Sequence, residues 1–217
     1  NTGLGSLSLN ETSTGAYNTA VGSGSLQKNT TASYNTAVGY QAAYTGATHS
    51  GVTAIGYSAL KANTGNLNFA GGYETLLSNT SGANNTAIGA QALRSNTTAS
   101  NNTAVGYQAG YSTTTGSYST SVGYQAHYSN TTGRNSALGY VALRSNTTGT
   151  NNTAVGDSAL YSTTTGNYNT ALGQEALQSN ITGSNNTSVG YQAGYTSSSK
   201  SNNSFFGYQA GLSNNQS

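Results

Sequence analysis

The sequence predicts an all-β fold, a parallel β-solenoid or β-roll, on three observations. A glycine recurs about every 17 residues along the chain, and this period is too short for a repeat built of two helices. The repeat is rich in Val, Thr, Tyr and Asn, which favour strands and turns over helices. The chain has 29 Gly but no Asn-Gly step, the dipeptide that tight antiparallel hairpins favour, so neighbouring strands are expected to run parallel.

The recurring glycine divides the chain into thirteen units, each predicted to form one rung. Two units are one residue short, from Gly56 to Gly72 and from Gly123 to Gly139, and we expect a tightened turn in each rather than a break in the stack. The units predict a single repeat domain over residues 1–217, a fragment of a longer fibre without caps. The repeat glycines are Gly5, Gly22, Gly39, Gly56, Gly72, Gly89, Gly106, Gly123, Gly139, Gly156, Gly173, Gly190 and Gly207.

Each unit carries the sequence NTAVG or a close variant, with Ala and Leu three and four residues after the glycine in most units. We expect segments such as Thr103–Gly110 and Thr153–Leu160 to form two short strands hinged at the glycine, with the Thr-rich stretch as the turn. One Val, one Leu and two Ala per unit would form the core. Because this core is small, we expect further burial against other copies, through tyrosines or the Ala and Leu positions, in a homotrimer or a filament.

An asparagine stands four residues before the glycine in eleven units. Amides stacked about 4.8 Å apart can hydrogen-bond along the axis of a solenoid, and asparagine tolerates left-handed turn geometry. We therefore interpret this position as structural. It includes Asn85, Asn102, Asn152 and Asn186.

All 17 tyrosines fall in three positions of the repeat, so stacked rungs would arrange them in columns. These columns are expected either to pack subunits together or to bind sugars or a host protein. The largest set directly follows the repeat glycine and comprises Tyr40, Tyr57, Tyr73, Tyr107, Tyr124, Tyr140, Tyr191 and Tyr208.

The composition argues against several classes of function. Charged residues make up 5% of the chain, too few for binding nucleic acid, and no apolar run approaches the roughly 20 residues of a membrane-spanning segment. Glu74 and Glu175 lie about six rungs apart, and His49 and His127 are isolated, so we expect structural histidines, no catalysis, no metal and no cofactor. Asn-x-Ser/Thr sequons in the turns are possible glycosylation sites if they face water: Asn29, Asn79, Asn96, Asn130, Asn146 and Asn180.

The NTAVG signature and its variants, at Asn85–Gly89, Asn102–Gly106, Asn152–Gly156 and Asn169–Gly173, resemble the head repeat of trimeric autotransporter adhesins. The resemblance covers essentially the whole chain, although the adhesin repeat is shorter. It implies a left-handed parallel β-roll assembled as a trimer on a bacterial surface. The repeat is also similar to those of phage and prophage tail fibres.

We therefore expect a non-enzymatic segment of an extracellular fibre, structural or adhesive, at a cell surface or on a virion. Its partners would be copies of itself and a host surface protein or glycan. The alternatives are a phage tail-fibre shaft, a self-polymerising extracellular filament, and an ice-binding β-solenoid, which the abundant threonines and the low charge would suit.

Overall fold

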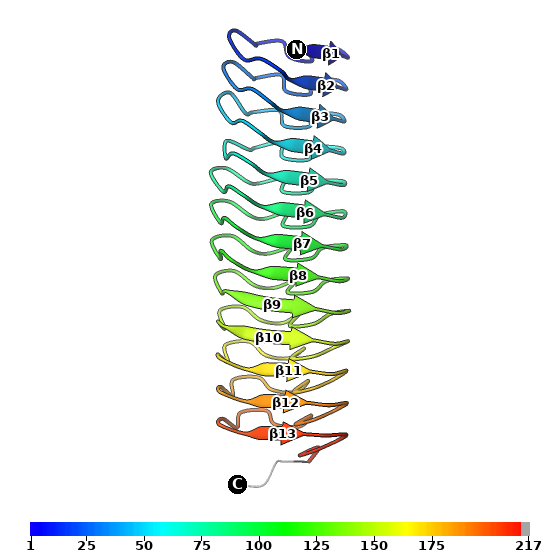
Figure 1. The fold of residues 1–217 in the computed structure, drawn as a ribbon, viewed down its shortest axis with the longest axis vertical. Helices are drawn as coiled ribbons and strands as arrows, with labels where there is room; N and C mark the ends of the chain where they lie inside the picture. Colours follow the sequence, from blue (N-terminus) through cyan, green and yellow to red (C-terminus); the bar gives the residue numbers. More distant parts are fainter. Residues whose placement is uncertain (214–217) are drawn as a thin grey trace.

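The computed structural model describes residues 1–213; residues 214–217 of the expected domain lie outside the described residues. The described chain is a rod of stacked coils in which every coil contributes one short strand (Figure 1). The strands form one thirteen-stranded sheet in sequence order, and every pair is parallel, as predicted. They are β1 (Thr2–Leu4), β2 (Thr19–Val21), β3 (Thr36–Val38), β4 (Thr53–Ile55), β5 (Phe69–Gly71), β6 (Thr86–Ile88), β7 (Thr103–Val105), β8 (Thr120–Val122), β9 (Asn135–Leu138), β10 (Asn152–Val155), β11 (Thr170–Leu172), β12 (Thr187–Val189) and β13 (Ser204–Phe206).

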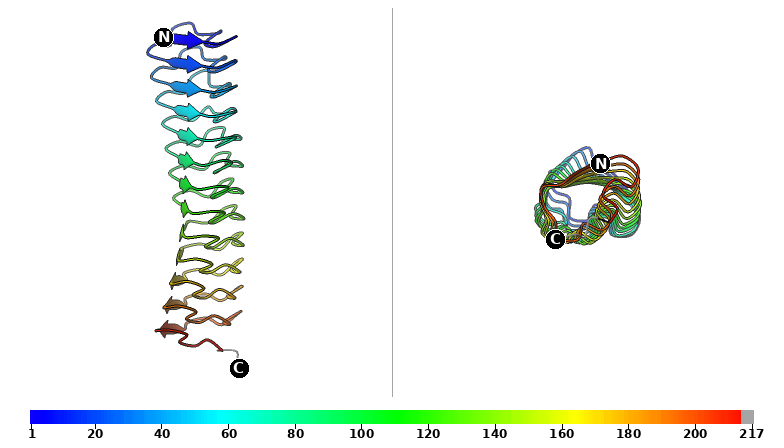
Figure 2. Two further views of the ribbon diagram at one scale, coloured as in Figure 1. Left: turned by 90° about the vertical axis from the view of Figure 1, so that its right-hand side faces the viewer. Right: turned by 90° about the horizontal axis from the view of Figure 1, so that it is seen from below.

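The register places equivalent residues of successive units beside one another. Ala87 of β6 pairs with Ala104 of β7, and the same match holds across the first short unit, where Ala54 pairs with Ala70. The missing residue is taken up in the turn, where the amide of Gly65 donates to the side chain of Asn63. Across the second short unit Ser121 pairs with Ala137, and the backbone amide of Gly133 donates to Asn130 Oδ1 at 3.1 Å. The prediction of tightened turns with unbroken stacking is confirmed for both units. The strands also rotate gradually about the long axis from β1 to β13 (Figure 2).

The repeat glycine is required by its backbone. Gly106 has a φ of 135°, and a Cβ atom on it would overlap the carbonyl oxygen of Gly123 in the next rung. The backbone of the next rung therefore packs against the Gly106 Cα and leaves no room for a side chain. Most of the other repeat glycines meet the same two conditions, namely Gly5, Gly22, Gly39, Gly56, Gly72, Gly89, Gly123, Gly139, Gly156, Gly173 and Gly190.

The expected second strand after the glycine does not form, so that prediction was wrong. The chain instead makes successive turns, in which the positions two and four after the glycine have left-handed backbones, as at Gln91 (φ 60°) and Leu93 (φ 49°). The Ala92 amide donates to the Gly89 carbonyl and closes the first turn. The turns also stack, because the Leu93 amide donates to Ala109 one rung on, at 3.0 Å. Inter-rung hydrogen bonds thus replace a sheet on this side.

The apolar half of the interior is filled by Ala and Leu. Within most strands a central Ala points inward, whereas the Thr before it and the Val, Ile or Leu after it point outward, as alternation in a strand requires. Ile88 is 44% exposed and Leu172 48% exposed. The expectation that this Val-type residue fills the core was therefore wrong. The inward Ala and Leu are buried inside one chain and do not form a face toward other copies, which corrects that part of the oligomer prediction.

The other half of the interior is polar and is held by an asparagine ladder, the column four residues before the glycine. The backbone amide of Asn102 donates to Asn85 Oδ1 at 3.0 Å, and the side-chain Nδ2 of Asn102 donates to the Gly116 carbonyl at 2.9 Å. The predicted hydrogen bonding along the axis is confirmed. The left-handed geometry, however, belongs to the preceding residue, such as Asn101 with φ of 60°. The ladder also includes Asn152 and Asn186.

Candidate functional site

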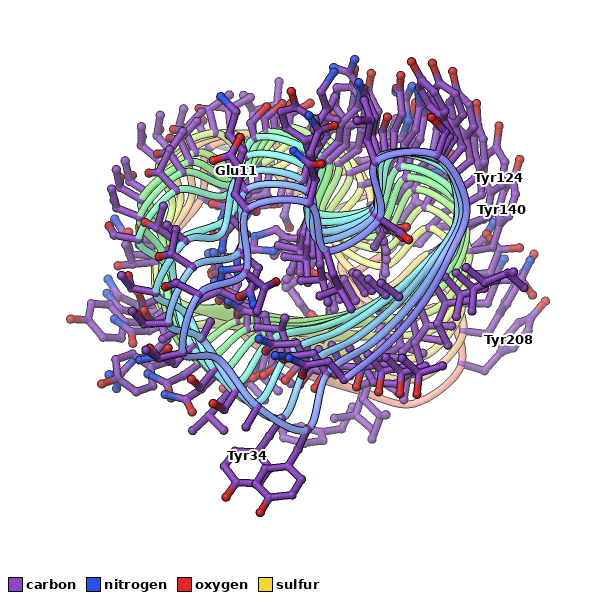
Figure 3. All side chains as sticks on the ribbon, turned by 90° about the horizontal axis from the view of Figure 1, so that it is seen from above. Glu11, Tyr34, Tyr124, Tyr140 and Tyr208 are labelled. Carbon is purple, nitrogen blue, oxygen red and sulfur yellow. The ribbon has the colours of Figure 1, made fainter. Side chains whose placement is uncertain are left out.

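The outer tyrosine column, formed by the tyrosines that directly follow the repeat glycine, lies on the surface of the rod. Viewed along the axis, Tyr124 and Tyr140 point outward at one edge of the coil (Figure 3). Their ring centroids are 5.3 Å apart and their rings are nearly parallel, so the predicted column exists. It consists of three stacked runs: Tyr40–Tyr57–Tyr73, Tyr107–Tyr124–Tyr140 and Tyr191–Tyr208.

A second column stands five residues after the glycine and mixes tyrosine with cationic side chains. Tyr111 and Tyr128 stack at 5.0 Å, and the guanidinium carbon of Arg144 lies 5.3 Å from the Tyr128 centroid and 6.0 Å from the Tyr161 centroid. Arg144 is thus held between two aromatic rings by cation–π contacts. The third set, five residues before the glycine, includes Tyr34, which projects from another side of the rod (Figure 3).

A glutamine ladder runs between the outer and second columns. Gln125 donates to Gln108, and Gln108 donates to Gln91, both at 2.8 Å. At one end of the ladder Gln91 reaches Glu74, and at the other end Arg144 Nε donates to Gln125 Oε1 at 2.9 Å. The ladder orders the surface between the two aromatic columns.

Two arginines in equivalent positions have different partners on this surface. Arg94 Nε donates to Glu74 Oε2 at 2.8 Å, and this hydrogen bond lowers the pKa of the Glu74 carboxyl, which keeps it ionised. Arg144 makes the corresponding hydrogen bond to Gln125, which is neutral. The charge of Arg94 is therefore compensated by Glu74, whereas Arg144 forms no ion pair with the part of the chain that the structure describes.

A hollow of about 440 Å³ opens beside Arg144. It forms where the position two residues after the glycine changes from Gln125 to the shorter Val141 and Ser158 in the next two rungs. The hollow is lined by Tyr124, Gln125, Tyr140, Val141, Arg144, Ser158, Tyr161 and Gln178. Sequence reasoning proposed Tyr124 and Tyr140 as packing or binding residues but missed the others. The signal was present in the aligned units, where Gln125 stands at the position that Glu74 occupies beside Arg94.

The six asparagines proposed for glycosylation do not face water. Asn29, Asn79, Asn96, Asn130, Asn146 and Asn180 are all 0% exposed and point into the coil beside the asparagine ladder. Five of them donate from Nδ2 to a carbonyl three residues on, as Asn79 does to Gly82 at 2.8 Å. The expectation that these turn residues offer water-facing sequons was wrong, because neighbouring turn residues such as Thr80 and Ser81 are exposed while the asparagines are buried.

Both histidines are buried, and burial lowers the pKa of each. Burial lowers the pKa of His127 to about 3, and its ring nitrogens lie 3.3 Å from Ser121 Oγ and 3.1 Å from Asn135 Nδ2. Burial lowers the pKa of His49 to about 4. The His49 ring fills the space that an asparagine side chain fills in most other rungs, because Gly46 stands at that asparagine position.

Within residues 1–213, no three His, Cys, Asp or Glu side chains gather in a way that could hold a metal ion. The same residues include no helix long and apolar enough to cross a membrane. Comparison with protein-family models, with curated proteins and with solved structures gives no match to this chain.

Proposed function

We propose that this chain is a non-enzymatic segment of an extracellular fibre, with a structural or adhesive role. The observation that carries the proposal is the unbroken stack of thirteen strands, which brings equivalent positions of successive units to the surface at a regular spacing. Twelve steps of about 4.8 Å give a rod of roughly 58 Å. Such a rod sets weak binding surfaces at regular spacing, and their contacts add through avidity.

The resemblance to adhesin head repeats supports a left-handed homotrimer at a bacterial surface as the specific form of this proposal. The outward column of Val, Ile and Leu, one residue before the glycine, offers the apolar contact that such a trimer needs. Ile55 is 45% exposed and Leu138 49% exposed on this face, and the column is interrupted at Gly71 of β5. An exposed apolar stripe of this kind is typical of an interaction surface.

Electron microscopy and light scattering of the purified chain test the proposal. We expect thin uniform rods with the mass of three chains. Replacing Ile55, Ile88 and Leu138 together with Thr should yield monomers that keep the β-rich circular dichroism spectrum, whereas replacing the exposed Thr86, Thr103 and Thr120 with Ser should leave the trimer intact. Monomers of the unaltered chain would contradict the trimer, and compact globular particles would contradict the fibre. Open-ended filaments would favour a self-polymerising form.

Ice binding is a second candidate because the threonine column of the sheet faces outward. Thr86, Thr103, Thr120 and Thr153 are all exposed, beside the Val-type column. The rotation of the strands about the long axis works against a flat ice-binding face (Figure 2). Ice shaping and thermal hysteresis that are lost when these threonines are replaced with Lys would favour this function over adhesion.

A further inference from the structure

We propose that the hollow beside Arg144 binds a sugar unit that carries a carboxylate, such as a uronic acid within an acidic polysaccharide. This inference names the ligand class of an adhesive fibre, and it rests on the proposed function for its biological setting.

The charge of Arg144 is not paired with an acid within residues 1–213. Among residues 1–213 the ion pair found is Arg94–Glu74, and Gln125 replaces the acid in the equivalent position beside Arg144. Two other acids lie near this surface, and neither lines the hollow. The exposed Asp157 accepts a hydrogen bond from Ser158 Oγ at 2.7 Å, and Glu175, one rung beyond Ser158, accepts one from Gln192 Nε2 at 2.6 Å. An uncompensated guanidinium at the edge of a hollow favours an anionic ligand.

The guanidinium is also held in place before any ligand binds. Nε donates to Gln125 at 2.9 Å, Nη1 lies 3.4 Å from the Tyr161 hydroxyl, and the rings of Tyr128 and Tyr161 flank the charge. These contacts use two of the five N–H donors of arginine and leave three for a ligand. A fork of donors in a fixed plane matches the geometry of a carboxylate.

The rest of the hollow suits a sugar ring. Tyr140 ends the stacked run that begins at Tyr107, and Asp157 takes the next position in the column, so no aromatic ring covers the far face of Tyr140. The Tyr140 side chain is 56% exposed. Gln178 and Ser158 add hydrogen-bonding groups to the wall.

The size of the hollow and its single charge narrow the ligand class. A volume of about 440 Å³ lies within the usual range of small-ligand sites, and the hollow opens to the surface, so one sugar unit can enter while its chain continues outside. A single arginine is too little charge for a nucleic-acid backbone. An aromatic face, neutral hydrogen-bonding groups and one cation together fit a monocarboxylate sugar.

The test is an NMR titration of the whole chain with an oligosaccharide of glucuronic acid and with the neutral oligosaccharide of glucose. We expect shifts at residues around Arg144 with the acidic sugar and at least tenfold weaker binding of the neutral one. Arg144→Gln should weaken acidic-sugar binding at least tenfold. This variant keeps a residue that the fold accepts, because Gln178 stands at the equivalent position of another unit. Gln125→Glu should do the same, because it recreates the Glu74–Arg94 arrangement.

Arg94→Gln is the matched control and should leave binding unchanged. No binding, equal binding of the two sugars, or binding that survives both Arg144→Gln and Gln125→Glu would overturn the proposal. Circular dichroism and electron microscopy of each variant separate this result from the proposed function. Trimeric rods that fail to bind contradict the sugar site alone, whereas the absence of rods contradicts the fibre.

Discussion

Replacement of Asn102 with Ala removes one step of the asparagine ladder in the middle of the rod. Asn102 Oδ1 accepts the amide of Ser119 at 2.8 Å, and Nδ2 donates to the Gly116 carbonyl at 2.9 Å. Asn102 is 1% exposed, so water does not replace these partners without opening the coil. The substitution therefore leaves two buried backbone groups unpaired.

The expected loss follows from those two groups. Each buried group without a partner costs about 1–3 kcal/mol, so Asn102→Ala should lower the free energy of unfolding by about 2–6 kcal/mol. The loss is measured by guanidinium unfolding followed by circular dichroism. Hydrogen exchange gives a local readout, because the Ser119 amide loses its acceptor and should exchange faster than in the unaltered chain.

Thr103→Val is the control for Asn102→Ala, since Thr103 is exposed on the adjacent residue of the strand. It should change the free energy of unfolding by less than about 0.5 kcal/mol. If Asn102→Ala cost as little as the control, or if the Ser119 amide kept its protection, the asparagine ladder would not hold the rungs together.

Three further outcomes are expected. Gly106→Ala should destabilise the fold by more than about 2 kcal/mol, since its Cβ overlaps the next rung. Gly24→Gln should be tolerated, because other rungs carry Gln at the equivalent position, two after the repeat glycine, with left-handed φ. Thermal unfolding compares the two variants. The pKa of His127 is lowered from 6.5 to about 3 on folding, so between these pH values the unfolded chain binds more protons and the free energy of unfolding falls as pH drops. His127→Leu should make the free energy of unfolding depend less steeply on pH in unfolding experiments across pH 3–7. An unchanged pH dependence would contradict the buried, neutral state of His127. Gly46→Asn makes a side chain clash with the ring of His49 and should be strongly destabilising alone, but adding His49→Gly should recover most of the lost stability. Additive effects in this double-mutant cycle would show that His49 does not occupy the volume of the missing asparagine side chain.

The sequence predicts the parts of this fold that depend on repetition. A period of 17 residues with a fixed glycine is sufficient to predict stacked parallel rungs, because Gly106 and most of its equivalents meet the same carbonyl of the next rung. The asparagine ladder and the tyrosine columns follow from the same register. These features need only that like residues superpose.

The direction of each side chain is harder to predict because the period does not fix it. Leu93 and Gln91 have left-handed backbones, which non-glycine residues rarely adopt, so a segment that resembles a strand becomes a series of turns. For the same reason Ile88 was expected in the core but points outward, and Asn79 was expected to face water but points inward. The hollow at Arg144 arises from differences between units rather than from the repeat itself, and a search for the common pattern overlooks it.

Distances between spin labels test the stacking most directly. The chain has no cysteine, so Cys at Thr19 can be paired with Cys at Thr86, Thr120 or Thr170, all on the exposed face of the sheet. These pairs are four, six and nine strands apart, and steps of about 4.8 Å predict distances of about 19, 29 and 43 Å. A linear increase with strand number, unaffected by the two short units, is the predicted result. Broad distributions, or distances that do not grow along the chain, would contradict it.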